Sequence, residues 1–233
     1  MFSNCKIIDL THSIDDSIAT WNGSCGFQHE VKLSYEQAGI CVQKFEMHAG
    51  IGTHMDAPTH FFEHGESIGQ LDIAHFFAPL ICIDLSAKVS PTLFAQVADI
   101  RSFEKTYGDI PKGAFVALYT SWSKYWFDSV KYRNEGIDKL MAFPGYSSEC
   151  AELLLERGVV GIGIDTLSPD GSNMTTFPVH KHILGAGLYI VENMKNLNLL
   201  PPVGAFIANL PMKIEVGSES AIRSVGFIPD NVI

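Results

Sequence analysis

The sequence lacks the features that mark nucleic-acid-binding, membrane-spanning or secreted proteins. It contains no run of basic residues, and its formal charge of −10 disfavours nucleic acid as a partner, because that binding depends on clustered Lys and Arg. No apolar run reaches the roughly 18 residues of a membrane-spanning helix, so we expect no membrane partner. The N-terminal residues lack a basic segment followed by an apolar one, and they predict a first strand instead of a signal peptide.

Cysteine is also sparse. The five cysteines, Cys5, Cys25, Cys41, Cys82 and Cys150, are odd in number, widely spread and without a CxxC pair. This usage favours free thiols in a reducing compartment over a disulfide framework or a cysteine-based zinc site. We therefore expect a cytoplasmic protein.

Apolar residues, in contrast, are abundant: they make up 46% of the chain, against 18% charged residues, which is ample material for a packed core. Several short apolar, β-rich runs are bounded by Gly, Pro or Asp. Continuous apolar runs of this length fit strands that are buried on both faces beneath helices. The predicted strands are Lys6–Leu10, Leu80–Leu85, Ala114–Tyr119, Val159–Ile164, Leu188–Val191 and Ala205–Ile207.

Two helices are expected between these strands. The clearer one is Ser148–Arg157, because Ser147 or Ser148 can cap its start and Gly158 can end it. The second lies near Pro91–Val97, where a proline would occupy the first helical position. No internal repeat or flexible linker divides the chain. We therefore expect one α/β domain over residues 1–233, with buried mixed sheets covered by helices.

The most informative segment is residues 48–62, HAGIGTHMDAPTHFF. His54, Asp56 and His60 share sequence parity, and the residue before Pro58 is biased toward extended geometry. Alternate side chains of an extended segment point the same way, so these three could converge on one small volume. Two imidazoles and a carboxylate can supply three ligands of a catalytic metal, or two ligands and a proton carrier. The alternative is a surface loop of hydrogen-bonded histidines.

A second group of candidate ligands lies nearer the C-terminal end. Glu192 ends an apolar strand, and a carboxylate beside aliphatic residues is costly to bury unless it is paired or metal-bound. His180 and His182 would project to one side of an extended segment, but not of a helix. Asp165 follows another buried strand, where catalytic groups of α/β folds collect. For Asp165 we favour a structural role, in which it caps a turn or holds backbone amides.

The sequence resembles the cyclase family of metal-dependent hydrolases, which includes bacterial kynurenine formamidase and isatin hydrolase. The family signature HxGTHxDxPxH corresponds to GIGTHMDAPTH at residues 50–60, and weaker counterparts lie before and after it, in the family's order, along nearly the whole chain. The resemblance implies a swivelling β/β/α fold in a homodimer or homotetramer. It also implies that each chain holds one or two divalent ions, zinc or manganese.

The resemblance also implies roles for individual residues. His54 and Asp56 match metal ligands, with Asp56 as the carboxylate that bridges two ions. His180 and Glu192 match ligands of the second ion. His60 matches the general acid/base.

Aromatic residues complete the implied site. Trp21 matches an aromatic residue that lines the substrate pocket, and we expect Phe62 beside it. A planar small molecule would stack on such rings.

The chain departs from the signature at one position. Gly50 replaces the first histidine, which is a ligand of the first ion in the family. His48 is an alternative ligand if Gly50 and Gly52 let the chain fold back. Without it, one ion would be held by the remaining ligands.

These observations give one leading hypothesis and two alternatives. The leading one is hydrolysis of an amide-type C–N bond, in an aryl formamide or a cyclic amide or imide, by metal-activated water, with His60 moving the proton. The first alternative is a small-molecule or metal-binding protein that lost activity along with the ligand at Gly50. The second is a metal-dependent lyase or dehydratase that uses the same groups.

Overall fold

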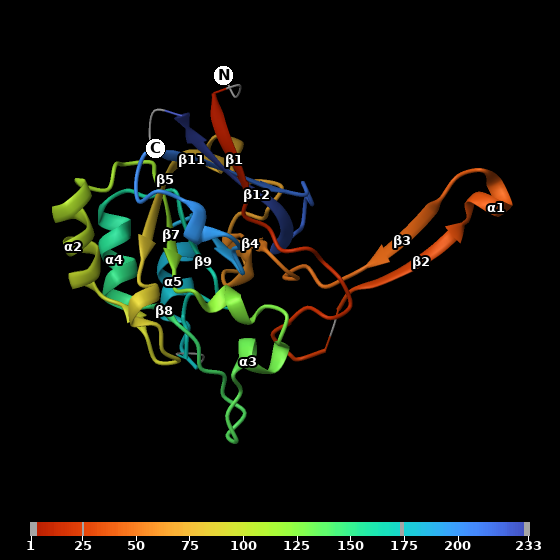
Figure 1. The fold of residues 1–233 in the computed structure, drawn as a ribbon, viewed down its shortest axis with the longest axis horizontal. Helices are drawn as coiled ribbons and strands as arrows, with labels where there is room; N and C mark the ends of the chain where they lie inside the picture. Colours follow the sequence, from red (N-terminus) through yellow and green to blue (C-terminus); the bar gives the residue numbers. More distant parts are fainter. Residues whose placement is uncertain (1–3, 25, 173–174, 231–233) are drawn as a thin grey trace.

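The computed structural model describes residues 4–24, 26–172 and 175–230, and a closed β-barrel lies at its centre (Figure 1). The strands of the main sheet are β1 (Cys5–Asp9), β4 (His54–Asp56), β5 (Phe77–Asp84), β7 (Phe115–Tyr119), β9 (Gly161–Ile164), β10 (Tyr189–Glu192), β11 (Ala205–Pro211) and β12 (Glu219–Pro229). The barrel runs β12-β11-β5-β7-β9-β10-β4 and closes because β4 also pairs with β12. β5, β7, β9 and β10 are parallel, and the other pairings are antiparallel.

Helices cover the outside of the parallel strands. The α-helices are α1 (Tyr35–Ala38), α2 (Val97–Tyr107), α3 (Ser129–Arg133), α4 (Ser148–Glu156) and α5 (Pro178–Gly185). In Figure 1, α2 and α4 lie side by side against the sheet. None of the helices in the described part of the chain is both long and apolar enough to cross a bilayer.

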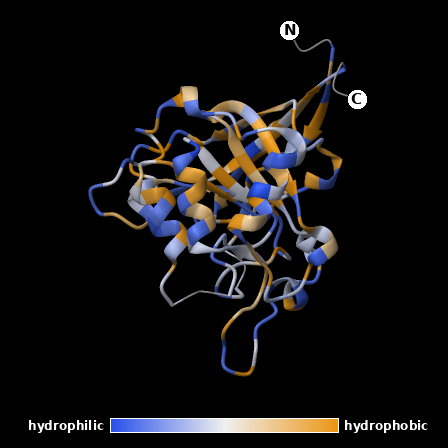
Figure 2. Cartoon of the chain, turned by 90° about the vertical axis from the view of Figure 1, so that its left-hand side faces the viewer, coloured by the Kyte–Doolittle hydropathy of each residue, from blue (hydrophilic) through white to orange (hydrophobic). Residues whose placement is uncertain are grey.

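Two apolar clusters explain why the strands read as continuous hydrophobic runs. Leu80 and Cys82 of β5 join the cluster inside the barrel, whereas Ile81 and Ile83 join the cluster beneath α2, α4 and α5. Successive residues of a strand point to opposite faces, so both faces of β5 must be apolar. Figure 2 shows the same layering, with apolar strands at the centre and hydrophilic segments around them.

The predicted strands are confirmed, with ends shifted by a few residues, and so is the α/β class. Helix α4 is confirmed as well, since the Ser147 hydroxyl accepts a hydrogen bond from Cys150 N at 3.1 Å. The helix expected near Pro91–Val97 is wrong. That segment forms strand β6 (Phe94–Ala95), which pairs with β8 (Gly145–Tyr146).

Helix α2 begins only at Val97, where that second predicted helix was expected to end. The Asp99 carboxylate accepts a hydrogen bond from Gln96 N at 2.9 Å. This acidic cap satisfies a free amide at the helix start. The cysteines Cys5, Cys41, Cys82 and Cys150 are free thiols, and Cys25 lies outside the described residues.

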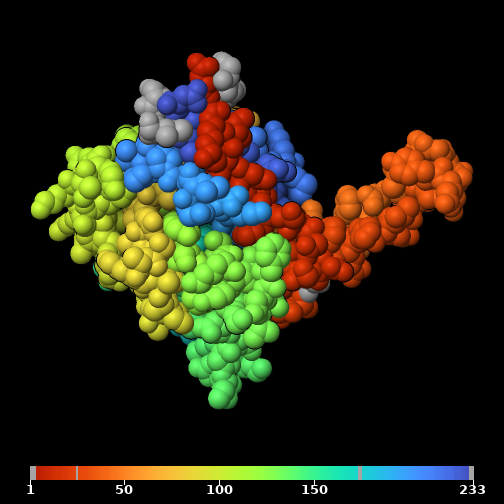
Figure 3. Space-filling view, in the orientation of Figure 1, coloured from red at the N-terminus to blue at the C-terminus, as the bar shows by residue number. Residues whose placement is uncertain are grey.

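One hairpin stands apart from the barrel. β2 (Gln28–Leu33) and β3 (Val42–Glu46) pair with each other, and α1 joins them at the tip. Every residue of both strands is exposed. In Figures 1 and 3 the hairpin, called the arm below, projects clear of the body.

Candidate active site

The candidate site lies where β10, β4 and β12 run side by side at the closure of the barrel. Glu192 is opposite His54 across one strand pair, and Glu219 is opposite Asp56 across the other. Cross-strand partners share a face, as do alternate residues of one strand, so these four side chains point to the same side. That side is the outer one, because Met55 between the two β4 residues packs inside the barrel.

Two helical segments add histidines to this face. The chain after β4 turns into a 3-10 helix, Pro58–His60, so His60 reaches the site through a turn and not by extending the strand. His180 comes from α5. Because this segment is helical, His182 points elsewhere, and its Nε2 lies 3.0 Å from the Ser148 hydroxyl.

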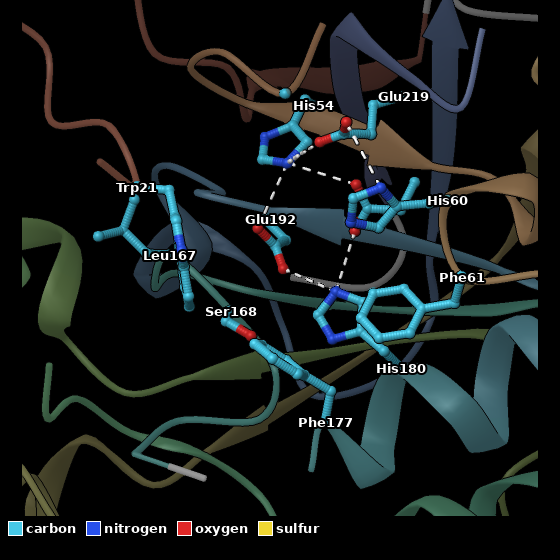
Figure 4. A pocket seen from close by; sticks show the side chains of 12 residues that line it. Trp21, His54, His60, Phe61, Leu167, Ser168, Phe177, His180, Glu192 and Glu219 are labelled. Atoms are coloured by element: carbon cyan, nitrogen blue, oxygen red, sulfur yellow. Dashed lines mark ion pairs between the residues drawn. The ribbon is translucent and has the colours of Figure 1, made fainter. Parts of the chain in front are cut away.

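These side chains line a cavity of about 270 Å³ (Figure 4). The ionisable groups occupy one wall. The other walls carry apolar side chains, Trp21, Phe61, Leu167 and Phe177, with Trp21 across the cavity from Phe61. None of the described lining residues is Lys or Arg.

Asp56 is the centre of the ionisable cluster and is only 1% exposed. Its Oδ1 lies 3.4 Å from His54 Nε2, and its Oδ2 lies 3.5 Å from His180 Nε2. Neither oxygen has a hydrogen-bond partner among the described residues. Glu192 faces the same two histidines, with its Oε2 3.3 Å from His54 Nε2 and its Oε1 3.4 Å from His180 Nε2.

These separations suit metal ligands better than hydrogen bonds. A good N–H···O bond measures about 2.9 Å, which is shorter than every contact in the cluster. Two ligand atoms held about 2.1 Å from a tetrahedral ion lie about 3.4 Å from each other. The atoms around Asp56 therefore sit at the spacing of a metal's ligand shell.

The two buried histidines are oriented by groups behind them. His54 Nδ1 donates to the Gly52 carbonyl oxygen at 2.9 Å, and that oxygen also accepts from Asn193 Nδ2 at 2.9 Å. His180 Nδ1 donates to Asp170 Oδ2 at 2.5 Å. With Nδ1 protonated in both rings, each neutral imidazole presents the lone pair of Nε2 to the cluster, as a metal ligand requires.

The charges in the cavity call for a cation. Burial raises the pKa of Glu219, and the nearby Asp56 charge raises it further. Burial opposes a charge on His54 and His180, but the surrounding carboxylates outweigh it and raise the pKa of both well above the usual value. A divalent ion would neutralise the same carboxylates. It would also compete with the second proton that each of these histidines tends to bind in the absence of metal.

The described residues therefore fit a divalent metal ion. Two sets of three residues could each hold an ion, because the three ligand atoms within a set lie within 4.8 Å of one another. Asp56 belongs to both sets. The sets are His54, Asp56 and Glu219, and Asp56, His180 and Glu192.

Two predicted residues lie outside the cavity. His48 is exposed on the approach to β4, and its ring lies against Gly26. Phe62 lines a separate hollow beside Gly185. The turn that ends the Pro58–His60 helix places Phe61, not Phe62, against His180, with ring centroids 4.7 Å apart.

Trp21 and Asp165 are placed by well-defined contacts. The Arg133 guanidinium donates to the Trp21 carbonyl oxygen, and the Trp21 ring centroid lies 6.0 Å from that of Phe177. Asp165 is fully buried outside the cavity and accepts from the backbone amides of Thr120 and Ser123 at 3.0 and 3.3 Å. The structural role expected for Asp165 is the one observed.

Glu219 and Asp170 are site residues that motif analysis does not identify. Glu219 opens a strand far along the chain from the signature, and only the β12–β4 register brings it beside Asp56. Asp170 lies in a turn before α5, and its carboxylate accepts from the first amides of that helix as well as from His180. A lone acidic residue in either setting carries no distinguishing pattern.

Comparisons with known proteins identify a matching family, related sequences and a similar solved structure. Residues 8–171 match the family described as "Putative cyclase". An isatin hydrolase from Roseibium aggregatum is 29% identical over 188 residues, covering 76% of this chain and 71% of that protein. A kynurenine formamidase from Bacillus thuringiensis subsp. konkukian is 26% identical over 233 residues, covering 94% and 95%. The solved structure of isatin hydrolase A from Ralstonia solanacearum has a TM-score of 0.90 and 32% identity, covering 97% and 92%.

Proposed function

This chain belongs to the cyclase family, and from that premise we propose that it hydrolyses an amide-type C–N bond in a small molecule with the help of a divalent metal ion. Relatives named isatin hydrolase and kynurenine formamidase support this reaction class. The observation that carries the proposal is Asp56, a buried carboxylate without hydrogen-bond partners among the described residues, whose two oxygens each face an imidazole nitrogen.

We propose His54, Asp56, His180 and Glu192 as metal ligands for one or two ions. Mixed imidazole and carboxylate donors suit zinc and manganese. Bound there, a divalent ion would polarise the substrate carbonyl and lower the pKa of a water molecule from about 15.7 to about 7. The Gly52 carbonyl and Asp170 bind Nδ1 of His54 and His180, which leaves Nε2 of each ring free to hold an ion.

His60 is the proton carrier in this proposal. It lines the cavity, and its ring lies edge-to-face with that of Phe61 at a centroid distance of 5.0 Å. Its side chain is 31% exposed, whereas those of His54 and His180 are almost fully buried. His60 takes a proton from the attacking water as the C–O bond forms, and gives it to the leaving nitrogen as the C–N bond breaks.

The walls of the cavity favour a small planar substrate, such as an aryl formamide or a cyclic amide or imide. Pockets for drug-sized ligands measure roughly 300–1,000 Å³, so this cavity of about 270 Å³ suits a smaller molecule. Trp21 and Phe177 offer ring faces and edges on which such a molecule can stack. These rings also exclude water from the apolar side of the substrate.

His60→Ala tests the proposal with an aryl formamide and a cyclic imide as substrates. Turnover should fall about 10²–10⁴-fold, because a positioned acid/base contributes that much. Metal content should stay that of the wild type, since His60 is not among the proposed ligands. The exposed His75 is a matched control, and His75→Ala should alter neither quantity.

Three results would contradict the proposal. Turnover of His60→Ala near the wild-type rate would remove the assigned role. Full metal occupancy without turnover by the wild type would favour a binding protein. In water labelled with heavy oxygen, a product without the label would indicate a lyase or dehydratase, because hydrolysis places solvent oxygen in the new carboxylate.

We further propose that the chain assembles as a homodimer or homotetramer through the arm. An isolated two-stranded hairpin is marginally stable in water. Yet the arm exposes apolar side chains on both strands, namely Val31, Leu33, Val42 and Phe45, and Tyr35 and Ile40 at its tip. A second copy of the chain would cover them.

A further inference from the structure

We infer that Glu219 is a metal ligand of this chain and occupies the place of the histidine that residue 50 lacks. The inference rests on the proposed metal-dependent function and extends it to a donor outside the signature. Its evidence is the space around Gly50, the position of the Glu219 carboxylate and the grouping of ligand atoms about Asp56.

Gly50 lies directly against the Glu219 carboxylate. A Cβ atom added there would overlap Glu219 Oε1, would lie 3.1 Å from Glu219 Cδ, and would lie 3.3 Å from His54 Nε2. Gly50 is not among the glycines with positive φ, so its backbone does not require glycine. The absent side chain instead leaves room beside His54, and the Glu219 carboxylate fills that room.

The Glu219 carboxylate faces two histidines of the cavity. Glu219 Oε1 lies 4.0 Å from His54 Nε2, and Oε2 lies 3.5 Å from His60 Nδ1. Both distances are too long for hydrogen bonds. The carboxylate is nevertheless held in the cavity, because Glu219 is the cross-strand partner of Asp56 and points to the same face.

The candidate ligands divide into two sets that meet at Asp56. Asp56 Oδ1 faces His54, and Asp56 Oδ2 faces His180. Glu192 completes the set around His180, and Glu219 supplies the third protein ligand for the set around His54. The structure thus contains two three-ligand sets that share one carboxylate, although the signature histidine is missing.

A narrower role for Glu219 makes a different prediction. If the carboxylate only orients His60, its removal changes proton transfer and leaves metal binding intact. Counting bound ions therefore separates the two roles without any measurement of activity.

The first experiment uses Glu219→Gln, which keeps the shape and removes the charge. Ions per chain are counted by mass spectrometry after equilibrium dialysis against zinc or manganese, and affinity is measured by competition with a chelator. We expect two ions for the wild type and one for the variant. The weaker site should lose more than about 100-fold in affinity, since even residues behind a ligand contribute 10–100-fold. Glu215→Gln, at an exposed position four residues earlier, controls for the lost charge and should keep two ions.

The second experiment moves the ligand back to residue 50. Gly50→Ala should displace the Glu219 carboxylate and leave one ion, because the new methyl group takes its space. Gly50→His should likewise push the Glu219 carboxylate aside, because that carboxylate is the end of a flexible side chain. Gly50→His combined with Glu219→Ala removes the overlap and should restore the second ion through the new imidazole.

The inference is overturned if Glu219→Gln binds the same number of ions as the wild type with the same affinity. It is also overturned if Gly50→Ala leaves metal binding unchanged. Failure of the proposed function looks different: the wild type would then bind no ion, or would bind ions and hydrolyse no amide.

Discussion

Asp170 controls the orientation of His180, and changing it to Asn should weaken metal binding through that histidine alone. The fully buried Asp170 carboxylate accepts three hydrogen bonds, from Val179 N at 2.8 Å, His180 N at 3.2 Å and His180 Nδ1 at 2.5 Å. All three partners are donors. Asp170→Asn replaces one acceptor oxygen with an NH2 group, so one donor must face another donor whichever way the amide is turned.

The expected magnitude follows from these contacts. Loss of a group that orients a metal-bound histidine costs about 10- to 100-fold in metal affinity, which is about 1.4–2.7 kcal/mol. The metal-free protein should also lose about 1.5–3 kcal/mol of stability, because the bonds to the carboxylate are charge-assisted. Asp170 also helps to keep the pKa of His180 high, so the variant should protonate this histidine less readily.

A double-mutant cycle separates orientation from general loosening of the fold. Metal affinity is measured by chelator competition for the wild type, Asp170→Asn, His180→Ala and the double variant. If Asp170 acts through His180, its substitution weakens binding only when His180 is present. Asp165→Asn is a matched control, because Asp165 is equally buried but holds amides away from the cavity. This role of Asp170 would be refuted if Asp170→Asn lowered metal affinity equally in the presence and absence of His180. It would also be refuted if Asp165→Asn lowered metal affinity as much as Asp170→Asn.

Two further predictions concern stability and assembly. Burial lowers the pKa of His12, stacked 3.9 Å from Trp126, to about 3. Only the unfolded chain then binds a proton at His12 between about pH 6.5 and pH 3, so His12 should contribute a fall of about 1.4 kcal/mol in the free energy of unfolding per pH unit of acidification, as urea titrations can measure. His12→Phe should remove this part of the slope, and an unchanged slope would contradict the assignment. Phe45→Glu on the arm should weaken self-association by at least about 30-fold in sedimentation experiments, the loss typical of a hot spot. Ile137 is exposed outside the arm, so Ile137→Glu should leave self-association unchanged. Equal masses for the two variants would exclude the arm as the interface.

Five strands of the barrel, β5, β7, β9, β10 and β11, could be predicted from the sequence because their signal is local. β7 and β9 are buried on both faces, so their apolar runs are continuous. Closure of the barrel could not be predicted, because it depends on a pairing between β4 and β12 that joins distant parts of the chain. The second predicted helix was misplaced because Pro91 favours a helix start at its own position. Helix α2 instead begins at Val97, where Asp99 accepts a hydrogen bond from Gln96 N.

The candidate ligands also include some that a local pattern predicts and one that only the fold brings to the site. His54 and Asp56 are two residues apart on one strand, so parity alone places them together. His60 also reaches the cavity, but by a different path, because Pro58 starts a 3-10 turn and ends the strand geometry. Glu219 required the cross-strand register, which no local pattern encodes.

The mismatch at Gly50 shows why a motif with one missing ligand need not describe a site with one missing ligand. A metal ion responds to donor atoms in space, and the β12–β4 register delivers the Glu219 carboxylate to the volume that a side chain on residue 50 would enter. Exchanging a neutral imidazole for a carboxylate keeps the donor count but adds a negative charge and a harder donor. Oxygen-rich donor sets suit manganese better than imidazole-rich sets do. The substitution should therefore change which ion the set around His54 prefers before it changes whether that set binds an ion at all.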